Sequence, residues 1–244
     1  GKRVVNKSTG LFASFFYATA VFPIQASHFF AVDILLTFFM TLTLWRLLEF
    51  FEKPSNQNAI IVGISFGLSL VTKISAAVLI APILTALIIV FLPLLKKPSR
   101  LYLKNFASAL LFIAVTPVIT FILLQPYALI DSKEFIAQNL LQSKMTHDAY
   151  IFPYTLQYVG KLPYIYELKN VFLWGLGPVL AIPAFIGVFY FIKDLSKKKF
   201  ILLIFFLAYF TAVGKFAVGW MRYMLPLYPL LCLFAAVLFL RVLK

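Results

Sequence analysis

The sequence predicts an all-α protein: a polytopic bundle of transmembrane helices that forms a single domain over residues 1–244. Hydrophobic residues make up 63% of the chain and charged residues only 12%, whereas a soluble domain is about half apolar and a quarter charged. The apolar residues fall into long runs separated by short basic clusters. A helix needs about 20 apolar residues to cross a bilayer, so lipid is the expected solvent for most of this chain.

Eight apolar runs are candidate spans. The run 59–95 is divided into two, because a single helix of that length would measure about 55 Å against a hydrocarbon core of about 30 Å. Lys73 interrupts the run and marks the expected turn. The spans are predicted at 9–24, 31–50, 58–72, 75–95, 105–125, 172–192, 200–214 and 223–240.

The distribution of Lys and Arg predicts the orientation of these spans. With residues 1–8 on the inner side, 15 of the 22 Lys and Arg residues lie in inner segments and 7 in outer ones. Cytoplasmic loops carry such an excess, so we expect a multi-pass protein of the cell membrane. The same rule explains the net charge of +14, and no nucleic-acid partner is predicted.

One polar segment, residues 126–170, is expected on the extracytoplasmic side. It shows little helical periodicity, but six aromatic residues lie between 150 and 166. Disordered segments have few aromatics, so we predict a loop ordered against the membrane rim. Tyr154 and Tyr158 are candidates for substrate contact, and an interfacial aromatic belt is the alternative explanation.

The charged residues at the outer rim are the candidate site. Asp33 opens the second span, where a carboxylate is costly unless it faces water, a cavity or a cation; a favourable interaction with the helix dipole is the alternative. Lys73 and Arg222 are suited to a phosphate group, although snorkelling or interfacial anchoring explains them equally. His28 lies on the same rim, as a possible substrate contact or a hydrogen-bonding belt residue.

The sequence shows no established metal or cofactor motif. Cys232 is the single cysteine, which leaves no disulfide framework and no cysteine metal site. His147 and Asp148 are adjacent but lack the further ligands that a metal requires. We therefore predict no cofactor and no metal residue, and the sequence leaves a divalent metal open without indicating one. Phosphate-cradling Gly-Lys loops, zinc-protease motifs and nucleophile elbows do not occur.

Four motifs, taken in order, resemble those of a known family. They are Ser27–Asp33 with the following Leu35–Phe39, Gly63–Lys73, the stretch from Pro153 to Pro178, and Arg222–Pro229. Together they cover about residues 25–240. In order and topology they are similar to the landmarks of the dolichyl-phosphate-mannose protein mannosyltransferase family, which includes phospholipid-carrier-dependent bacterial transferases and the lipid A aminoarabinose transferase.

The resemblance implies a GT-C fold with an extracytoplasmic active site. Its members transfer a hexosyl or pentosyl group, with inversion, from a polyprenyl-phosphate carrier in the membrane lipid to a protein, lipid or glycan acceptor. It places Asp33 near the reaction centre, and Lys73 and Arg222 at the carrier phosphate. The family's other acidic motif, in its first outer loop, does not occur in these residues. Because the sequence opens on Gly1-Lys2-Arg3, we expect a fragment that lacks two N-terminal spans and that loop.

Two other classes of protein stay open. A transporter or lipid-linked-glycan flippase explains the spans and the rim charges, but not the aromatic segment or the order of the motifs. A non-catalytic membrane relative explains the missing acidic motif. Residues upstream of Gly1 would separate this last class from an enzyme.

Overall fold

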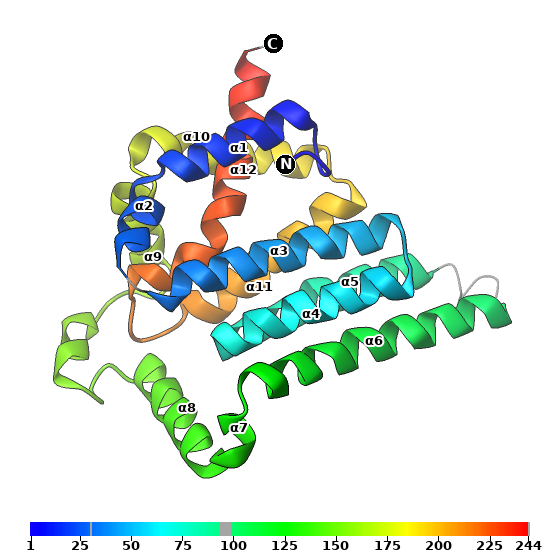
Figure 1. Cartoon of the computed structure of the whole chain (residues 1–244). Helices are drawn as coiled ribbons and strands as arrows, with labels where there is room; N and C mark the ends of the chain where they lie inside the picture. The colour runs from blue at the N-terminus through cyan, green and yellow to red at the C-terminus, as the bar shows by residue number, and fades with distance from the viewer. Residues whose placement is uncertain (30, 93–98, 244) are drawn as a thin grey trace.

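The computed structural model describes residues 1–29, 31–92 and 99–243, and it is all-helical (Figure 1). Helices account for 83% of the chain, and the described residues contain no strand. The predicted fold class is therefore confirmed at this level. Phe30 of the Ser27–Asp33 motif, and Lys96 and Lys97 of the predicted inner basic cluster, lie outside the described residues.

The first predicted span is a bent pair of helices. Helix α1 runs over Lys7–Thr19 and α2 over Val21–His28, and their axes differ by 54°. Pro23 accounts for the bend, because proline has no N–H to donate to the carbonyl four residues earlier and its ring crowds that carbonyl. The sequence analysis predicted one span at 9–24 and missed this break.

The chain reverses direction at Lys73, as predicted. Helix α3 (Val32–Glu52) is followed by α4 (Asn56–Thr72), which ends where Lys73 adopts an extended conformation with φ −164° and ψ 130°. The 3₁₀ helix η1 (Ile74–Leu79) and α5 (Ile80–Phe91) then run back along the bundle (Figure 1). One continuous helix over 58–95 is thereby excluded.

Helices α4 and α6 (Arg100–Leu124) pack closely through two glycines. A Cβ atom at Gly63 would lie 1.7 Å from Thr116 Oγ1, and one at Gly67 would lie 2.6 Å from Thr120 Cβ. Small residues four apart allow such an approach between membrane helices. Most other residues of α6 present apolar side chains outward, as expected of a helix in contact with lipid.

We expect Gly67→Leu to destabilise the protein, because the new side chain would meet both Thr120 and the Pro117 carbonyl of α6. Overpacking of this kind costs about 1–3 kcal/mol. The measurement is the thermal unfolding midpoint in detergent. Ile64→Phe is the matched control, since Ile64 is an exposed residue of the same helix; an equal loss in both variants would contradict this account of the interface.

The segment 126–170 contains more regular structure than its sequence indicated. It holds α7 (Tyr127–Ile130), α8 (Ser132–His147), the 3₁₀ helix η3 (Pro153–Tyr158) and α9 (Ile165–Asn170). Asp131 caps α8 by accepting a hydrogen bond from the Glu134 backbone N–H at 3.3 Å. The sequence analysis predicted this segment only as an ordered loop and did not predict these helices. Helix α8 lacks one continuous apolar face, so the periodicity rule missed it, although the Asp131–Glu134 spacing is a helix-start signal.

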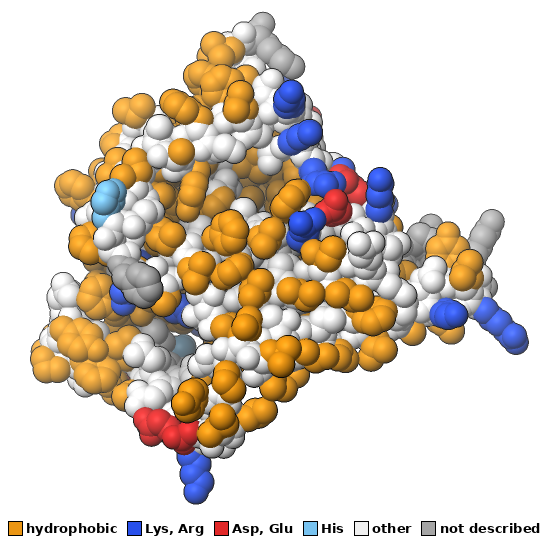
Figure 2. Space-filling model, in the orientation of Figure 1, with side chains coloured by type: hydrophobic (Ala, Val, Ile, Leu, Met, Phe, Trp, Pro, Cys, Tyr) orange, Lys and Arg blue, Asp and Glu red, His pale blue; other side chains and the backbone are white. Residues whose placement is uncertain are grey.

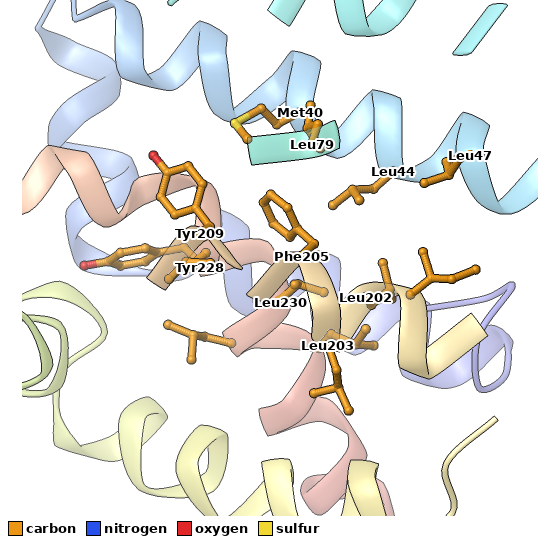
Figure 3. Packing of buried hydrophobic residues seen from close by; sticks show 14 of the residues in the cluster. Met40, Leu44, Leu47, Leu79, Leu202, Leu203, Phe205, Tyr209, Tyr228 and Leu230 are labelled. Atoms are coloured by element: carbon orange, nitrogen blue, oxygen red, sulfur yellow. The ribbon is translucent and has the colours of Figure 1, made fainter. Parts of the chain in front are cut away.

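The C-terminal part of the chain forms the core. A π-helical turn, η4 (Val171–Gly175), precedes α10 (Pro178–Lys193) and α11 (Lys197–Gly214), and the 3₁₀ helix η5 (Met221–Leu227) leads into α12 (Tyr228–Val242). Helix α12 packs between α1 and α10 and is apolar on nearly all sides, which is typical of a buried helix. Figure 3 shows Phe205, Tyr209, Tyr228 and Leu230 from these elements packed toward the α3 residues Met40 and Leu44.

Not all eight predicted spans have the length of a membrane crossing. Among the described residues, four helical segments are long and apolar enough, or five if the bent pair α1–α2 is one span. The four segments are Val32–Glu52, Ile74–Phe91, Arg100–Leu124 and Met221–Val242. The remaining predicted spans coincide with α4 and α10, of 17 and 16 residues, and with α11, which carries three lysines in its first turn.

The two ends of the bundle differ in their ion pairs. At one end Glu52 pairs with Arg3 and also with Lys198 at 2.6 Å, while Arg3 pairs with Glu49 at 3.0 Å. This network joins the segment 1–8, which the charge pattern assigned to the inner face, to the C-terminal end of α3 and to Lys198. Figure 2 shows basic and acidic side chains gathered at one place on a largely hydrophobic surface. Asp33 lies in the first turn of α3, and Lys73 directly follows α4. Both residues therefore lie at the end of the bundle opposite to this network.

Candidate active site

Asp33 forms ion pairs with two cations from distant parts of the chain. It lies in the first turn of α3, and its side chain is only 2% exposed. Its Oδ1 atom accepts a hydrogen bond from Lys73 Nζ at 2.8 Å, and its Oδ2 atom lies 3.6 Å from Arg222 Nε. A buried carboxylate needs such partners. Oδ2 lies beyond hydrogen-bond distance of Arg222 Nε, so it is the less committed of the two oxygens.

The two cations are held by aromatic rings and still reach the surface. Lys73 Nζ lies 4.3 Å from the centroid of the Tyr223 ring, and the Arg222 guanidinium lies 5.3 Å from the Trp220 ring. Cations are attracted to ring faces at these distances. The side chains of Lys73 and Arg222 are nevertheless 31% and 48% exposed, so an anion from outside can reach both.

The core of the bundle fixes the position of this charged cluster. Tyr209 of α11 is buried, and its hydroxyl donates a 2.9 Å hydrogen bond to the backbone carbonyl of Tyr223. Thr37 donates to the Asp33 carbonyl at 2.7 Å within α3. Asp33, Lys73 and Arg222 therefore sit at element ends that are anchored in packed structure, which is the arrangement that holds a functional site in register.

The outer segment is docked beside the cluster. The Ala217 backbone N–H donates to the Thr146 carbonyl at 2.7 Å, and the Tyr164 N–H donates to the Gly214 carbonyl at 3.0 Å. These bonds tie the segment to the link between α11 and η5. The buried ring of Tyr158 packs edge-on against Trp220 at 5.4 Å, so one aromatic pair connects the segment to Arg222.

Burial raises the pKa of the Tyr158 phenol to about 12, with smaller contributions from neighbouring tyrosines. The phenol is therefore neutral at physiological pH and does not act as a base. We expect Tyr158→Phe to leave any pH dependence of activity unchanged below about pH 9. In an absorbance titration of folded protein, the parent should show one more phenol than Tyr158→Phe ionising near pH 12; a difference that appears below pH 10 would contradict this environment.

The structure brings together some of the predicted site residues and leaves others apart. Asp33, Lys73 and Arg222 meet directly, and Tyr158 reaches them through Trp220. Tyr154 is half exposed and donates to Met145 Sδ at 3.6 Å. His28 is exposed, and its Nδ1 lies 2.8 Å from the Ile24 carbonyl of its own helix.

The sequence analysis missed the roles of two aromatic residues. Trp220 and Tyr223 flank Arg222 in the sequence, and the sequence analysis assigned them no role at the site; the structure shows their rings beside the two cations. Their position on either side of an arginine was the available signal. No group of three or more potential metal-ligating side chains occurs among the residues that the structure describes.

These observations define a helical membrane protein with a buried acid and two half-exposed cations at one end of its bundle. Residues 1–121, about half of the chain, match the family model of the dolichyl-phosphate-mannose-protein mannosyltransferases, and over these residues the chain is a member of that family. The family indicates a membrane glycosyltransferase of the GT-C type. Comparison with curated proteins and with solved structures found no match. Asp33 and Lys73 lie within the matched residues, and Arg222 lies outside them.

Proposed function

We propose that this protein transfers a sugar, with inversion, from a polyprenyl-phosphate carrier to an acceptor hydroxyl at the Asp33 cluster. The observation that carries the proposal is the arrangement of Asp33: a buried carboxylate between two partly exposed cations from three separate elements. A carboxylate for the acceptor and cations for a phosphate leaving group are the components that such a transfer needs. Membership of residues 1–121 in the mannosyltransferase family supports the same reaction class.

The side chains of the Asp33 cluster account for the proton and the leaving group of the proposed reaction. The acceptor oxygen forms a bond to the anomeric carbon as the bond from that carbon to the phosphate oxygen breaks. The acceptor proton passes to Asp33, for which the less committed Oδ2 atom is the suitable oxygen. The electron pair of the broken bond leaves with the carrier phosphate, whose added charge is met by Lys73 and Arg222. Attack on the face opposite the phosphate inverts the anomeric centre.

The two cations suit different parts of a phosphate group. Arginine presents a planar fork that can donate two parallel hydrogen bonds, whereas lysine acts as a compact point charge. Tyr223 and Trp220 hold the cations from their ring faces, so each keeps N–H groups for an incoming oxygen. A phosphate bound here would lie directly beside the Asp33 carboxylate.

The test is transfer by the purified protein from a synthetic polyprenyl-phosphate sugar, followed by mass spectrometry of carrier and acceptor. Release of free polyprenyl phosphate together with a glycosylated acceptor supports the proposal. Movement of the intact lipid-linked sugar between leaflets of a vesicle, without cleavage, would favour a flippase. Neither cleavage nor movement would favour a non-catalytic relative.

We further propose that all eight predicted spans cross the membrane and that the Asp33 cluster faces the extracytoplasmic side. The basic excess in the segments that include Lys197 supports this orientation. In a Cys232→Ala background, Lys144→Cys should react with a membrane-impermeant thiol reagent in intact cells, whereas Lys197→Cys should be protected until the cells are opened. Both positions are exposed in the structure, so the reverse labelling pattern would overturn the orientation.

A further inference from the structure

We infer that the polar cleft next to Tyr158 binds a sugar unit of the acceptor, so that the acceptor is a glycan. This inference rests on the proposed function, because only a transferase has an acceptor. The cleft has a volume of about 400 Å³, within the range of small-molecule sites. It lies between the end of α8, the η3 region and the link after α11. Its polar and aromatic walls come from His147, Asp148, Tyr150, Tyr158, Lys161 and Lys215.

The cleft is separated from the charged cluster by two aromatic residues. Tyr158 lines the cleft and packs against Trp220 at 5.4 Å. Trp220 in turn lies under the guanidinium of Arg222, whose Nε is 3.6 Å from Asp33 Oδ2. The cleft is therefore joined to the proposed reaction centre by a short series of side-chain contacts. An acceptor of several sugar units with one unit in the cleft can extend toward the charged cluster, which is the position of a remote acceptor subsite.

The walls of the cleft are fixed by buried structure. Lys161 forms an ion pair with Glu167, and these side chains are only 4% and 5% exposed. The Tyr166 ring and the Lys161 ammonium pack directly on Gly219, where a Cβ atom would lie 2.8 Å and 2.9 Å from them. Such a buried pair holds the segment in one geometry, because breaking it would leave an uncompensated charge. A pre-organised cleft loses less entropy on binding.

The mixture of donors and acceptors matches sugar hydroxyls. The exposed Lys215 ammonium only donates, an ionised carboxylate only accepts, and phenol hydroxyls do both. One Asp148 oxygen already accepts from the Tyr150 N–H at 2.9 Å, which leaves its other oxygen for a ligand. Each sugar hydroxyl can donate and accept, so neighbouring hydroxyls can satisfy this mixed lining. A phosphate would face Asp148, and an ammonium ligand would face Lys215.

An aromatic surface is also available. Tyr150 is 71% exposed at the mouth of the cleft, so its ring can cover the apolar face of a sugar while the polar groups bind the hydroxyls. The combination of one open ring and several convergent polar groups is typical of an oriented ligand site. These features together favour a neutral sugar over a charged headgroup or an acyl chain.

The experiment is saturation-transfer NMR on the purified full chain. The probes are three neutral trisaccharides, built from glucose, mannose or N-acetylglucosamine, together with a charged trigalacturonate and a serine-containing peptide. We expect saturation of at least one neutral trisaccharide, and little of the charged sugar or the peptide. Preferential saturation of the peptide or of trigalacturonate would overturn the inference, as would the absence of saturation in all neutral probes.

Two matched variants place the binding in the cleft. Val159→Trp fills the cleft, because Val159 lines it and is 43% exposed. Leu156→Trp is the control: it is 48% exposed, belongs to the neighbouring η3 helix and is not a wall of the cleft. We expect at least a fivefold loss of saturation in the first variant and none in the second. Equal signals in parent, Val159→Trp and Leu156→Trp would overturn the inference.

The binding readout separates this inference from the proposed function. Saturation transfer from the protein to a bound trisaccharide does not require the transfer reaction, so the Asp33→Asn variant should show the same NMR signal as the parent. One outcome is that the protein transfers no sugar but binds a trisaccharide, and that Val159→Trp abolishes this binding. That outcome would support the sugar site in the cleft and contradict the proposed reaction. The other outcome is that sugar transfer depends on Asp33, while Val159→Trp changes neither transfer nor saturation of the trisaccharide. That outcome would support the proposed reaction and contradict the sugar site in the cleft.

Discussion

Asp33→Asn is expected to lower the rate of sugar transfer at least about tenfold, since a general base commonly contributes 10²-fold or more. Asparagine keeps the size of the side chain and still accepts a hydrogen bond from Lys73, but it cannot take up the acceptor proton. The loss should fall mainly on kcat. The measurement is steady-state transfer from a defined polyprenyl-phosphate sugar by purified protein.

Stability and a control variant make this prediction specific. Neutralising Asp33 leaves Lys73 and Arg222 without their carboxylate, but their exposed fractions of 31% and 48% allow water to solvate them. We therefore expect a folded protein with a modestly lower unfolding midpoint. Asp131→Asn is the control, because it keeps the cap of α8 and lies away from the cluster. If Asp33→Asn transfers sugar at the parent rate, the carboxylate is a structural ion-pair partner only.

Lys73→Gln is expected to raise the apparent KM for the carrier-linked sugar more than it lowers kcat. The Lys73 side chain is 31% exposed and pairs with the same carboxylate as Arg222, so we expect it to meet the phosphate already in the ground state. Removal of an interaction shared by ground and transition states acts on KM. Kinetics at two salt concentrations add a second measurement, because charge attraction at a partly exposed site weakens with salt.

The control for Lys73 is Lys133→Gln on the exposed surface of α8, which should leave both constants unchanged. Lys73→Arg should restore part of the affinity, because it restores the charge with a different geometry. A fall in kcat alone, at unchanged KM, would show that Lys73 contributes only when the phosphate leaves. The assignment of Lys73 to carrier binding would then be wrong.

The sequence could predict features that depend on neighbouring residues. Apolar runs located the cores of the helices, and the single charge of Lys73 inside such a run located the reversal between α4 and η1. The small residues Gly63 and Gly67, four positions apart, are a sequence signal for the close approach that α6 makes. In each case the responsible residues lie within one or two helical turns of each other.

The features that the sequence could not predict depend on distant residues. Arg222 meets Asp33 across 189 positions of the chain, and nothing local to η5 specifies which acid will pair with it. The contact between Tyr158 and Trp220 depends on docking of the outer segment through backbone bonds such as Ala217 to Thr146. The bend between α1 and α2 is an exception, because Pro23 is a local signal for it that the prediction of one span at 9–24 did not use.

The double pairing of Asp33 has a consequence for when the base can act. In this structure the same two cations hold the carboxylate that the proposed reaction uses as its base. A carrier phosphate that draws Lys73 and Arg222 toward itself weakens their attraction for Asp33 and makes its oxygens better proton acceptors. The base is then fully competent only in the donor complex, while an acceptor glycan can occupy its cleft with or without the donor. A dead-end acceptor analogue should therefore be noncompetitive against the donor.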